Sequence, residues 1–288
     1  MRLATLRTGG DQSRSAGAAR RTRAVRVDDD VVVELDAPDV GALLQGGPDA
    51  LAAAATASGT EHALATADFA PVVTHPGKII CQGLNYRSHI LEMGHELPEF
   101  PTLFAKFREA LIGAHDEIVL PELSTEPDWE AELALVIGHP VRHATAAEAE
   151  GAIAGFTVAN DVTMRDWQYR SLEFLAGKTW EQSTPVGPWL VTPDELGGPR
   201  PDLAVGCAVD GVVHQHARTH ELIFDGPQLV AYVSEFITLQ PGDLILTGTP
   251  AGVGHGMRPP VYLQPGQVVR TTIEGIGELR NPCRAEHP

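Results

Sequence analysis

The chain has 288 residues, 43% of them hydrophobic and 20% charged, so it can bury the core of one large domain or of a large and a small one. Its formal net charge of −17 argues against a nucleic-acid partner and against an anionic membrane surface, because binding either requires Lys and Arg. The 3 cysteines form no C-x-x-C motif, the N-terminus has no apolar signal region, and no apolar run reaches the roughly 18 residues of a membrane span. We therefore expect a cytoplasmic protein without a disulfide framework.

Residues 1–73 predict a small N-terminal α+β domain. We expect strands at residues 3–6, 24–27 and 31–35, a disordered loop at 9–23, and helices at 40–44 and 49–57. No motif in this part carries chemistry, so we expect a packing role for it. Residues 74–288 are predicted to form the catalytic domain.

A strand predicted at residues 78–81 leads into a polar segment. If the chain is helical beyond Asn85, His89 and Glu92 are i,i+3 neighbours on one face. A carboxylate that orients a histidine fixes its tautomer and stabilises the imidazolium, which is the arrangement of a general base. The alternative is an ordinary pair on a helix surface. The glycine and prolines that follow, within residues 94–101, favour a mobile flap.

Three acidic residues are associated with two predicted core strands. The apolar run 133–137 predicts one strand, and side-chain alternation places Glu130 and Glu132 before it on the same side, about 7 Å apart. A second predicted strand, 154–159, delivers Asp161 at its end. The alternative is two glutamates on a solvated face, but the apolar run is unsuited to a surface strand. Three hard oxygen ligands without an adjacent His or Cys suit Mg²⁺ or Mn²⁺.

Cationic and amide side chains follow Asp161 closely, among them Arg165, Gln168 and Lys178. If they face the metal, they can hold an anionic substrate in this acidic protein. The alternative for each cation is a solvated surface charge.

The last third of the chain is predicted to be mostly strand and turn. We expect a Pro/Gly-rich turn that leads into a strand at 181–191, a hairpin at 203–214 and a helix at 227–236. The glycine-rich stretch 246–254 lacks the G-K-[ST] ending of a P-loop, and no helix pattern follows it. Its amides and threonine hydroxyls are better suited to a carboxylate.

Six stretches, in this order and spacing, resemble the fumarylacetoacetate hydrolase family. They are GLNYRSH (83–89), DWEAELALVIG (128–138), NDVTMRDWQ (160–168), GKTWEQSTPVGPW (177–189), LTGTPAGVG (246–254) and IEGIGELRN (273–281). The resemblance covers residues ~75 to 283. It implies a mostly β (α+β) fold with a rolled, mixed β-sheet, a small N-terminal domain and a homodimer.

The resemblance also implies roles for individual residues. Glu130, Glu132 and Asp161 match the family's ligands for a divalent metal, Mg²⁺ or Mn²⁺. The other predicted site residues are the water-activating pair His89 and Glu92 on a lid, the catalytic Lys178, and the substrate contacts Asn85, Tyr86, Arg165, Gln168 and Thr249.

Family substrates are 2-oxo acids with a 4-acyl group, so the resemblance implies Mg²⁺-dependent hydrolysis of a carbon–carbon bond in an acylpyruvate, as in aromatic-compound catabolism. Pyruvate and a carboxylic acid are the products. The family also contains oxaloacetate-type decarboxylases, tautomerases, hydratases and 2-hydroxyhepta-2,4-diene-1,7-dioate isomerases on the same metal site. The pair His89 and Glu92 favours hydrolysis, because loss of CO₂ needs no attacking water. A non-catalytic binding protein would need no such pair on a flap.

Overall fold

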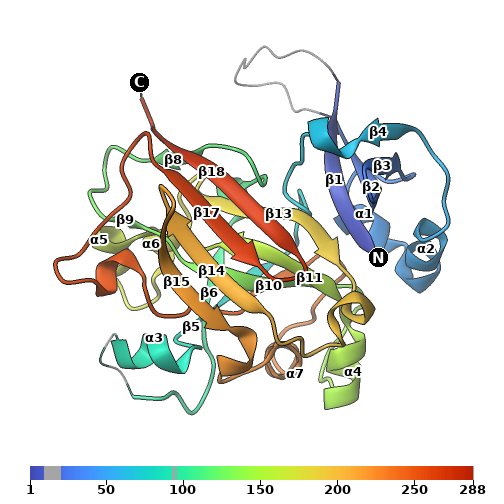
Figure 1. Cartoon of the computed structure of the whole chain (residues 1–288). Coiled ribbons are helices and arrows are strands. Elements are labelled where there is room, and N and C mark those ends of the chain that lie inside the picture. The colour runs from blue at the N-terminus through green and yellow to red at the C-terminus, as the bar shows by residue number, and fades with distance from the viewer. Residues whose placement is uncertain (10–20, 93, 95, 288) are drawn as a thin grey trace.

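The two strands of the acidic motif lie at the centre of a large mixed sheet (Figure 1). The structure is a computed structural model that describes residues 1–9, 21–92, 94 and 96–287. Strands β10 (Ala131–Ile137) and β11 (Ile153–Asn160) pair antiparallel, with Ala131 opposite Asn160 and Glu132 opposite Ala159. This register brings the start of β10 next to the end of β11, where the acidic residues are.

In the described chain the main sheet has the order β4-β3-β2-β1-β13-β11-β10-β16-β5-β6, with β7 paired to β13. Its other strands are β1 (Arg2–Thr8), β2 (Arg21–Asp28), β3 (Val31–Glu34), β4 (Glu61–Ala63), β5 (Ile79–Gly83), β6 (Thr102–Lys106), β7 (Leu111–Ile112), β13 (Thr184–Val191) and β16 (Leu244–Leu246). The pair β16 and β5 is parallel, so the sheet is mixed as expected.

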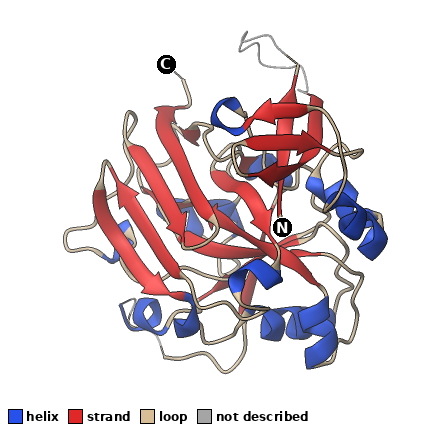
Figure 2. Cartoon of the chain, turned by 45° about the vertical axis from the view of Figure 1, so that its right-hand side comes forward, coloured by secondary structure: helices blue, strands red, loops and turns tan. Residues whose placement is uncertain are grey.

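A second sheet packs over the first (Figures 1 and 2). Its order is β15-β14-β17-β18-β8. The strands are β8 (Ile118–Leu120), β14 (Ala204–Val209), β15 (Val212–Arg218), β17 (Val268–Ile273) and β18 (Gly277–Ala285), and a separate small pair joins β9 (Pro127–Asp128) to β12 (Thr163–Met164). The predicted hairpin is confirmed as β14 and β15.

Strand β10 is buried on both faces, which explains its nearly continuous apolar sequence. Leu133, Leu135 and Ile137 belong to the core between the two sheets. Ala134 and Val136 point the other way, into a core shared with the N-terminal strands and α1 (Val40–Gln45). By the same alternation, the Glu132 side chain lies on the face of Ala134 and Val136, and its carboxylate is buried as well.

The remaining helices are short. They are α2 (Gly47–Ala54), α3 (Arg87–Glu92), α4 (Ala146–Gly151), α5 (Arg165–Gln168), α6 (Leu175–Lys178) and α7 (Gly226–Ser234). Asp225 caps α7, because its side chain accepts a hydrogen bond from the Gln228 N–H. No helix in the described part of the chain is long and apolar enough to span a membrane.

Each predicted N-terminal strand and helix has a counterpart in the structure, although some bounds differ and β4 was not predicted. Residues 21–23, predicted to be loop, begin β2, and residues 10–20 of the predicted loop lie outside the described residues. Outside the N-terminal part, residues 184–188, predicted to be a turn, already belong to β13, where this segment pairs with β7 and with β11. Pairing with neighbouring strands therefore outweighed the local Pro/Gly signal.

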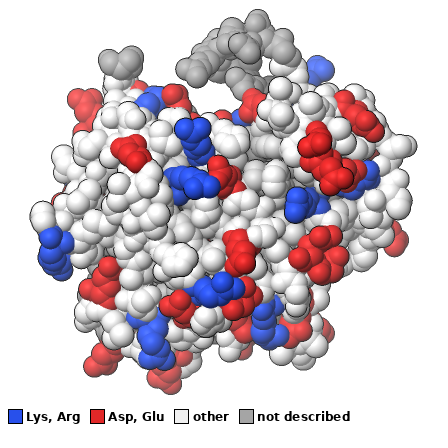
Figure 3. Space-filling model, viewed as in Figure 1, with Lys and Arg blue, Asp and Glu red and all other residues white. Residues whose placement is uncertain are grey.

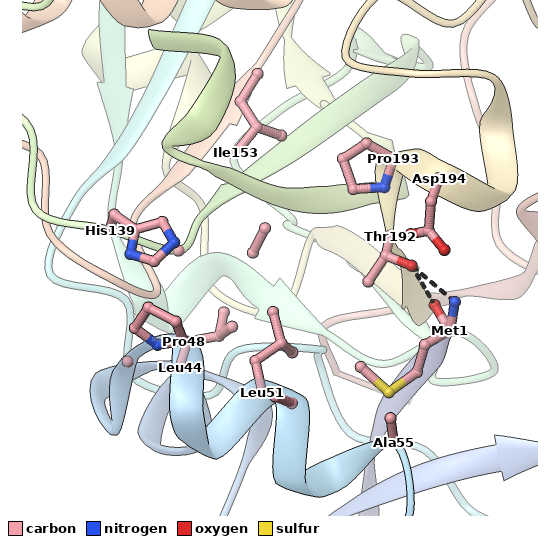
Figure 4. Close-up of a pocket in the computed structure, with 14 residues that line it drawn as sticks. Met1, Leu44, Pro48, Leu51, Ala55, His139, Ile153, Thr192, Pro193 and Asp194 are labelled. Atoms are coloured by element: carbon pink, nitrogen blue, oxygen red, sulfur yellow. Dashed lines mark hydrogen bonds between the residues drawn. The ribbon is translucent and has the colours of Figure 1, made fainter. Parts of the chain in front are cut away.

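The boundary predicted at residue 73 does not interrupt the main sheet, because β1 pairs directly with β13. A cavity of about 410 Å³ lies at this junction, lined by Leu44 and Leu51 on one side and by Ile153 and Thr192 on the other (Figure 4). The Met1 ammonium group donates to Thr192 Oγ1 across 2.7 Å. The division into two domains stays a prediction.

Candidate active site

The three predicted acidic ligands meet at one end of β10 and β11. One ligand oxygen from each of Glu130, Glu132 and Asp161 lies within 4.8 Å of the others, and all three side chains are buried. The backbone explains the meeting, since the Asp161 N–H donates to the Glu130 carbonyl across 2.8 Å. Glu130 immediately precedes β10 and Glu132 lies within it, so the two side chains point the same way.

Two buried lysines neutralise part of this negative charge. Lys178, the last residue of α6, donates to Glu130 Oε2 at 2.7 Å and to Asp161 Oδ2 at 2.8 Å. Lys106, the last residue of β6, donates to Asp161 Oδ1 at 2.6 Å. Burial acts to lower the pKa of Lys178, but the two carboxylates outweigh it and raise this pKa above its usual value. Lys178 is therefore a fixed positive charge.

Arg165, at the start of α5, connects the cluster to a fourth buried carboxylate. Its Nη2 lies 2.7 Å from Glu130 Oε1, and its Nε donates to Asp128 Oδ2 at 2.8 Å. Asp128 also accepts backbone N–H bonds from Gly254 and His255, which hold it in place. Burial acts to raise the pKa of Glu130, but Lys178 and Arg165 outweigh it and hold this pKa at about 2.

Glu132 differs from its neighbours. Among the described residues it forms no ion pair with a Lys, Arg or His, and its Oε2 accepts a hydrogen bond from the Gly248 N–H at 2.7 Å. Burial, together with the charges of Asp161 and Glu130, raises the pKa of Glu132 well above its usual value. A buried carboxylate of this kind is stabilised by a proton or by a cation.

The donor set fits a divalent ion. Among the described residues, four buried carboxyl groups face three cations, so one negative charge has no partner when all four are ionised. The oxygens of Glu130, Glu132 and Asp161 are hard ligands that suit Mg²⁺ or Mn²⁺, and among the described residues no nitrogen or sulfur ligand belongs to the group. These three side chains would hold the ion.

His89 and Glu92 lie on α3, as the sequence predicted. His89 Nδ1 is 3.3 Å from Glu92 Oε2, and the Gly252 N–H donates to Glu92 Oε1 at 3.1 Å. Burial acts to raise the pKa of Glu92, but the bonds from His89 and from Gly252 outweigh it and lower this pKa. The pair can act as an oriented base because the carboxylate itself is fixed by the backbone.

A cavity of about 270 Å³ lies between Glu130 of the acidic cluster and His89 of this pair, whereas Glu92, Glu132 and Asp161 lie outside its lining. Its lining includes most of the predicted site residues, namely His89, Glu130, Arg165, Gln168, Lys178 and Thr249. Gln168 Oε1 accepts from Arg165 Nη1 at 2.9 Å, and the Thr249 hydroxyl donates to the Ala131 carbonyl at 3.0 Å. The volume falls just below the roughly 300–1,000 Å³ typical of drug-sized ligands, so it suits a small substrate.

A family model described as the fumarylacetoacetate (FAA) hydrolase C-terminal domain matches residues 78–284, which contain this whole site. The chain belongs to the fumarylacetoacetate hydrolase family. The family consists of enzymes, and many of its members use a divalent metal. The prediction of the family and that of the fold are both confirmed.

Relatives within the fumarylacetoacetate hydrolase family carry different reaction names. The oxaloacetate tautomerase FAHD2A, mitochondrial, of Homo sapiens is 45% identical over 215 residues, which cover 74% of this chain and 68% of the relative. The fumarylacetoacetate hydrolase of Exiguobacterium antarcticum superposes with a TM-score of 0.82 at 30% identity, covering 99% of this chain and 100% of that one. A 5-carboxymethyl-2-hydroxymuconate delta-isomerase from Mycobacterium smegmatis gives 0.77 at 32% identity, with 100% of each chain covered.

Two predicted substrate contacts of this family member lie outside the cavity lining. The Asn85 amide donates to the carbonyls of Phe224 and Thr247, so it joins backbone segments. Tyr86 is fully buried, and burial raises the pKa of its hydroxyl. Their contact with substrate stays a prediction, as do the roles of the other site residues.

The sequence analysis did not predict that Lys106 and Asp128 form buried ion pairs in this site. Lys106 stood out only as a lysine in an otherwise apolar segment, and its side chain is fully buried against Asp161. Asp128 is the first residue of the motif at 128–138, but its hydrogen bond with Arg165 joins residues 37 positions apart in the sequence. A charged residue inside an apolar run is the signal that could have identified Lys106.

Proposed function

We propose that this enzyme hydrolyses the carbon–carbon bond between the acyl group and the pyruvate unit of a small 2,4-dioxo acid, with Mg²⁺ or Mn²⁺ as its cofactor. The observation that carries the proposal is that His89 lines the same cavity as Glu130 of the acidic cluster, while Glu92 orients the His89 ring from outside the lining. An acylpyruvate and water then give pyruvate and a carboxylic acid.

The metal, when bound, supplies a Lewis acid that stabilises negative charge on the 2-oxo oxygen of the substrate. Glu130, Glu132 and Asp161 hold it. Lys178 and Arg165 are fixed positive charges beside it that bind the anionic end of the substrate and offset charge that develops during bond cleavage.

His89 removes a proton from the attacking water, and Glu92 holds the ring in the required tautomer. The Nδ1 atom faces Glu92, so Nε2 is the nitrogen that remains for the water. The proton is then available for the carbon of the leaving pyruvate unit. The Gly252 N–H, by fixing Glu92, keeps the base in position.

A second candidate is tautomerisation of oxaloacetate, which the name of the human relative supports. That reaction moves a proton between C3 and the 2-oxo oxygen, and His89 can carry it without an attacking water. Decarboxylation of an oxaloacetate-type acid and isomerisation of a 2-hydroxydienoate are further reactions that use the same stabilised enolate.

The variant His89→Ala separates hydrolysis from decarboxylation. Loss of a general base costs about 10²–10⁴-fold, so hydrolysis of acetylpyruvate should fall by at least about tenfold more than decarboxylation of oxaloacetate. Products are identified by mass with the Mg²⁺-loaded protein. Equal losses in both reactions would contradict the role of His89 in activating water. A parent enzyme that tautomerises oxaloacetate and hydrolyses no acylpyruvate would establish the second candidate.

We also propose that the protein acts as a cytoplasmic homodimer. Family membership supports the dimer. The location differs from that of the relatives at 44–45% identity, which are named as mitochondrial. Light scattering coupled to size-exclusion chromatography measures the mass, and a single species near 30.7 kDa would contradict the dimer.

A further inference from the structure

The active-site cavity has a second wall that the proposed reaction does not use. This wall is apolar and consists of Leu84, Phe104, Tyr169 and Phe174. Its three rings contact in a row, with centroids 6.2 Å apart for Phe104 and Phe174 and 6.4 Å apart for Phe174 and Tyr169, both edge to face. Lys178 Nζ lies 4.8 Å from the Phe104 centroid, so the row begins beside the acidic cluster.

Two residues of this wall have a left-handed backbone, with φ of 56° at Leu84 and 62° at Phe174. This conformation is uncommon for side chains of their size and costs free energy. The other positive-φ residues of the described chain that are not glycine are polar and lie outside the cavity lining: Asp29, His143, Gln182 and Asp210. Backbone strain at a position that faces a ligand is typical of a side chain held in place for binding.

The charges of the cavity are confined to its other wall. Lys178 and Arg165 each form an ion pair with Glu130 at 2.7 Å. In the proposed reaction these two cations bind the 2-oxo acid end of the substrate, so among the described lining residues no Lys or Arg is left for a second carboxylate. A carboxylate at the far end of a substrate, placed against the rings, would lose its hydration without gaining an ion pair.

We propose that this cavity selects 2-oxo acids whose acyl group beyond C4 is uncharged and flat, with an aromatic ring fitting best, over those that end in a second carboxylate. Leu84 and Phe174 are the residues that set this specificity. The inference rests on the proposed function for its kinetic test, while its binding test does not need turnover.

The kinetic test compares benzoylpyruvate with fumarylpyruvate. We expect kcat/KM to be at least about tenfold higher for benzoylpyruvate, the scale on which an apolar pocket discriminates. Phe174→Gly and Leu84→Gly remove the side chain and relieve the backbone, so both should fold. Each should lower kcat/KM for benzoylpyruvate by about tenfold through KM, with a smaller loss for acetylpyruvate, whose methyl group covers little of the wall.

Gln182→Gly is the matched control, because it changes a residue with φ of 52° outside the cavity lining. It should leave all three substrates unaffected. A preference for fumarylpyruvate, or equal effects of Phe174→Gly on every substrate, would overturn the inference.

The binding test uses phenylpyruvate and 2-oxoglutarate, a 2-oxo acid with a ring and one with a second carboxylate. Titration calorimetry of the Mg²⁺-loaded protein should give a Kd at least about tenfold lower for phenylpyruvate, and Phe174→Gly should remove the difference. If no acylpyruvate is hydrolysed but this preference holds, the proposed function fails and the inference stands. Tighter binding of 2-oxoglutarate would refute the inference whatever the reaction.

Discussion

Glu132 is the residue whose energetics depend most on a bound cation. Its carboxylate is buried beside Asp161 and Glu130, which raises its pKa, so its charge destabilises the metal-free fold at neutral pH. Glu132→Gln should therefore be at least as stable as the parent in urea with a chelator. Mg²⁺ at about 100 times its Kd should stabilise the parent by about 2.7 kcal/mol and the variant by almost nothing. Equal stabilisation of both proteins would remove Glu132 from the metal site.

Lys178 is predicted to act electrostatically rather than as a metal ligand. Lys178→Met should keep Mg²⁺ binding in calorimetry and lose roughly 10²–10³ in turnover, the usual effect of removing one preorganised donor. The matched control is Lys78→Met, since Lys78 also pairs with a buried carboxylate, Asp243, at 2.6 Å, but outside the cavity lining. If both variants keep parental turnover, Lys178 has no catalytic role.

Glu92 predicts a pH dependence of stability. Its pKa is lowered in the folded state because bonds from His89 and Gly252 outweigh burial. A lowered carboxyl pKa stabilises the fold above the unfolded value of about 4.5, and this contribution is lost as pH falls through the folded value. The urea midpoint of Glu92→Gln should therefore lie below the parent's at pH 7 and approach it as the pH falls through the folded value. The exposed Glu99→Gln is the control, and a pH-independent difference would contradict the assignment.

At the scale of elements, the placement of Lys178 depends on close packing of α5 and α6. Gly177 has no room for a side chain, because a Cβ there would lie 2.5 Å from the backbone N and Cα of Gln168. Gly177→Ala should push the helices apart and displace both Gln168 and Lys178. We expect at least about a tenfold loss in kcat, since small misplacements of catalytic groups are costly.

Gly151→Ala is the control for that substitution, since a Cβ at Gly151 meets no atom within 4 Å. Circular dichroism and thermal unfolding of both variants distinguish local displacement from loss of the fold. Full activity of Gly177→Ala would show that Lys178 tolerates movement of α6.

At the scale of the whole molecule, the N-terminal segment is part of the main sheet. Residues 1–73 supply four strands and α1, and Leu3 and Leu44 share a core with Val136 of β10. A chain that begins at residue 74 would expose the β13 edge and that apolar face. We expect it to aggregate or to unfold at a clearly lower temperature than the full chain. A soluble fragment with full activity and an unchanged melting temperature would support two independent domains.

The net charge is likewise a property of the whole molecule. Asp and Glu are interspersed with fewer Lys and Arg on the face in Figure 3. The positive charge that an anionic substrate needs is instead buried in the site, where Lys106, Lys178 and Arg165 are close together. A net charge of −17 is therefore compatible with an anionic substrate.

The family, the central strands and the acidic group could be predicted from the sequence, because these depend on local patterns. Alternation placed Glu130 and Glu132 on one side, and apolar continuity predicted that β10 is buried. The helix predicted from residue 227 is α7, which begins one residue earlier. The spacing of His89 and Glu92 likewise required only one short helix.

The partners that surround those residues could not be predicted in the same way, because they depend on tertiary packing. The salt bridge from Lys106 to Asp161 joins positions 55 residues apart, and the row of rings requires β6 and the start of α6 to meet. Periodicity is a property of one segment, whereas the partners of a buried charge depend on how distant segments pack. The same reason explains why Asn85, which the motif suggested for substrate, joins two backbone segments instead of lining the cavity.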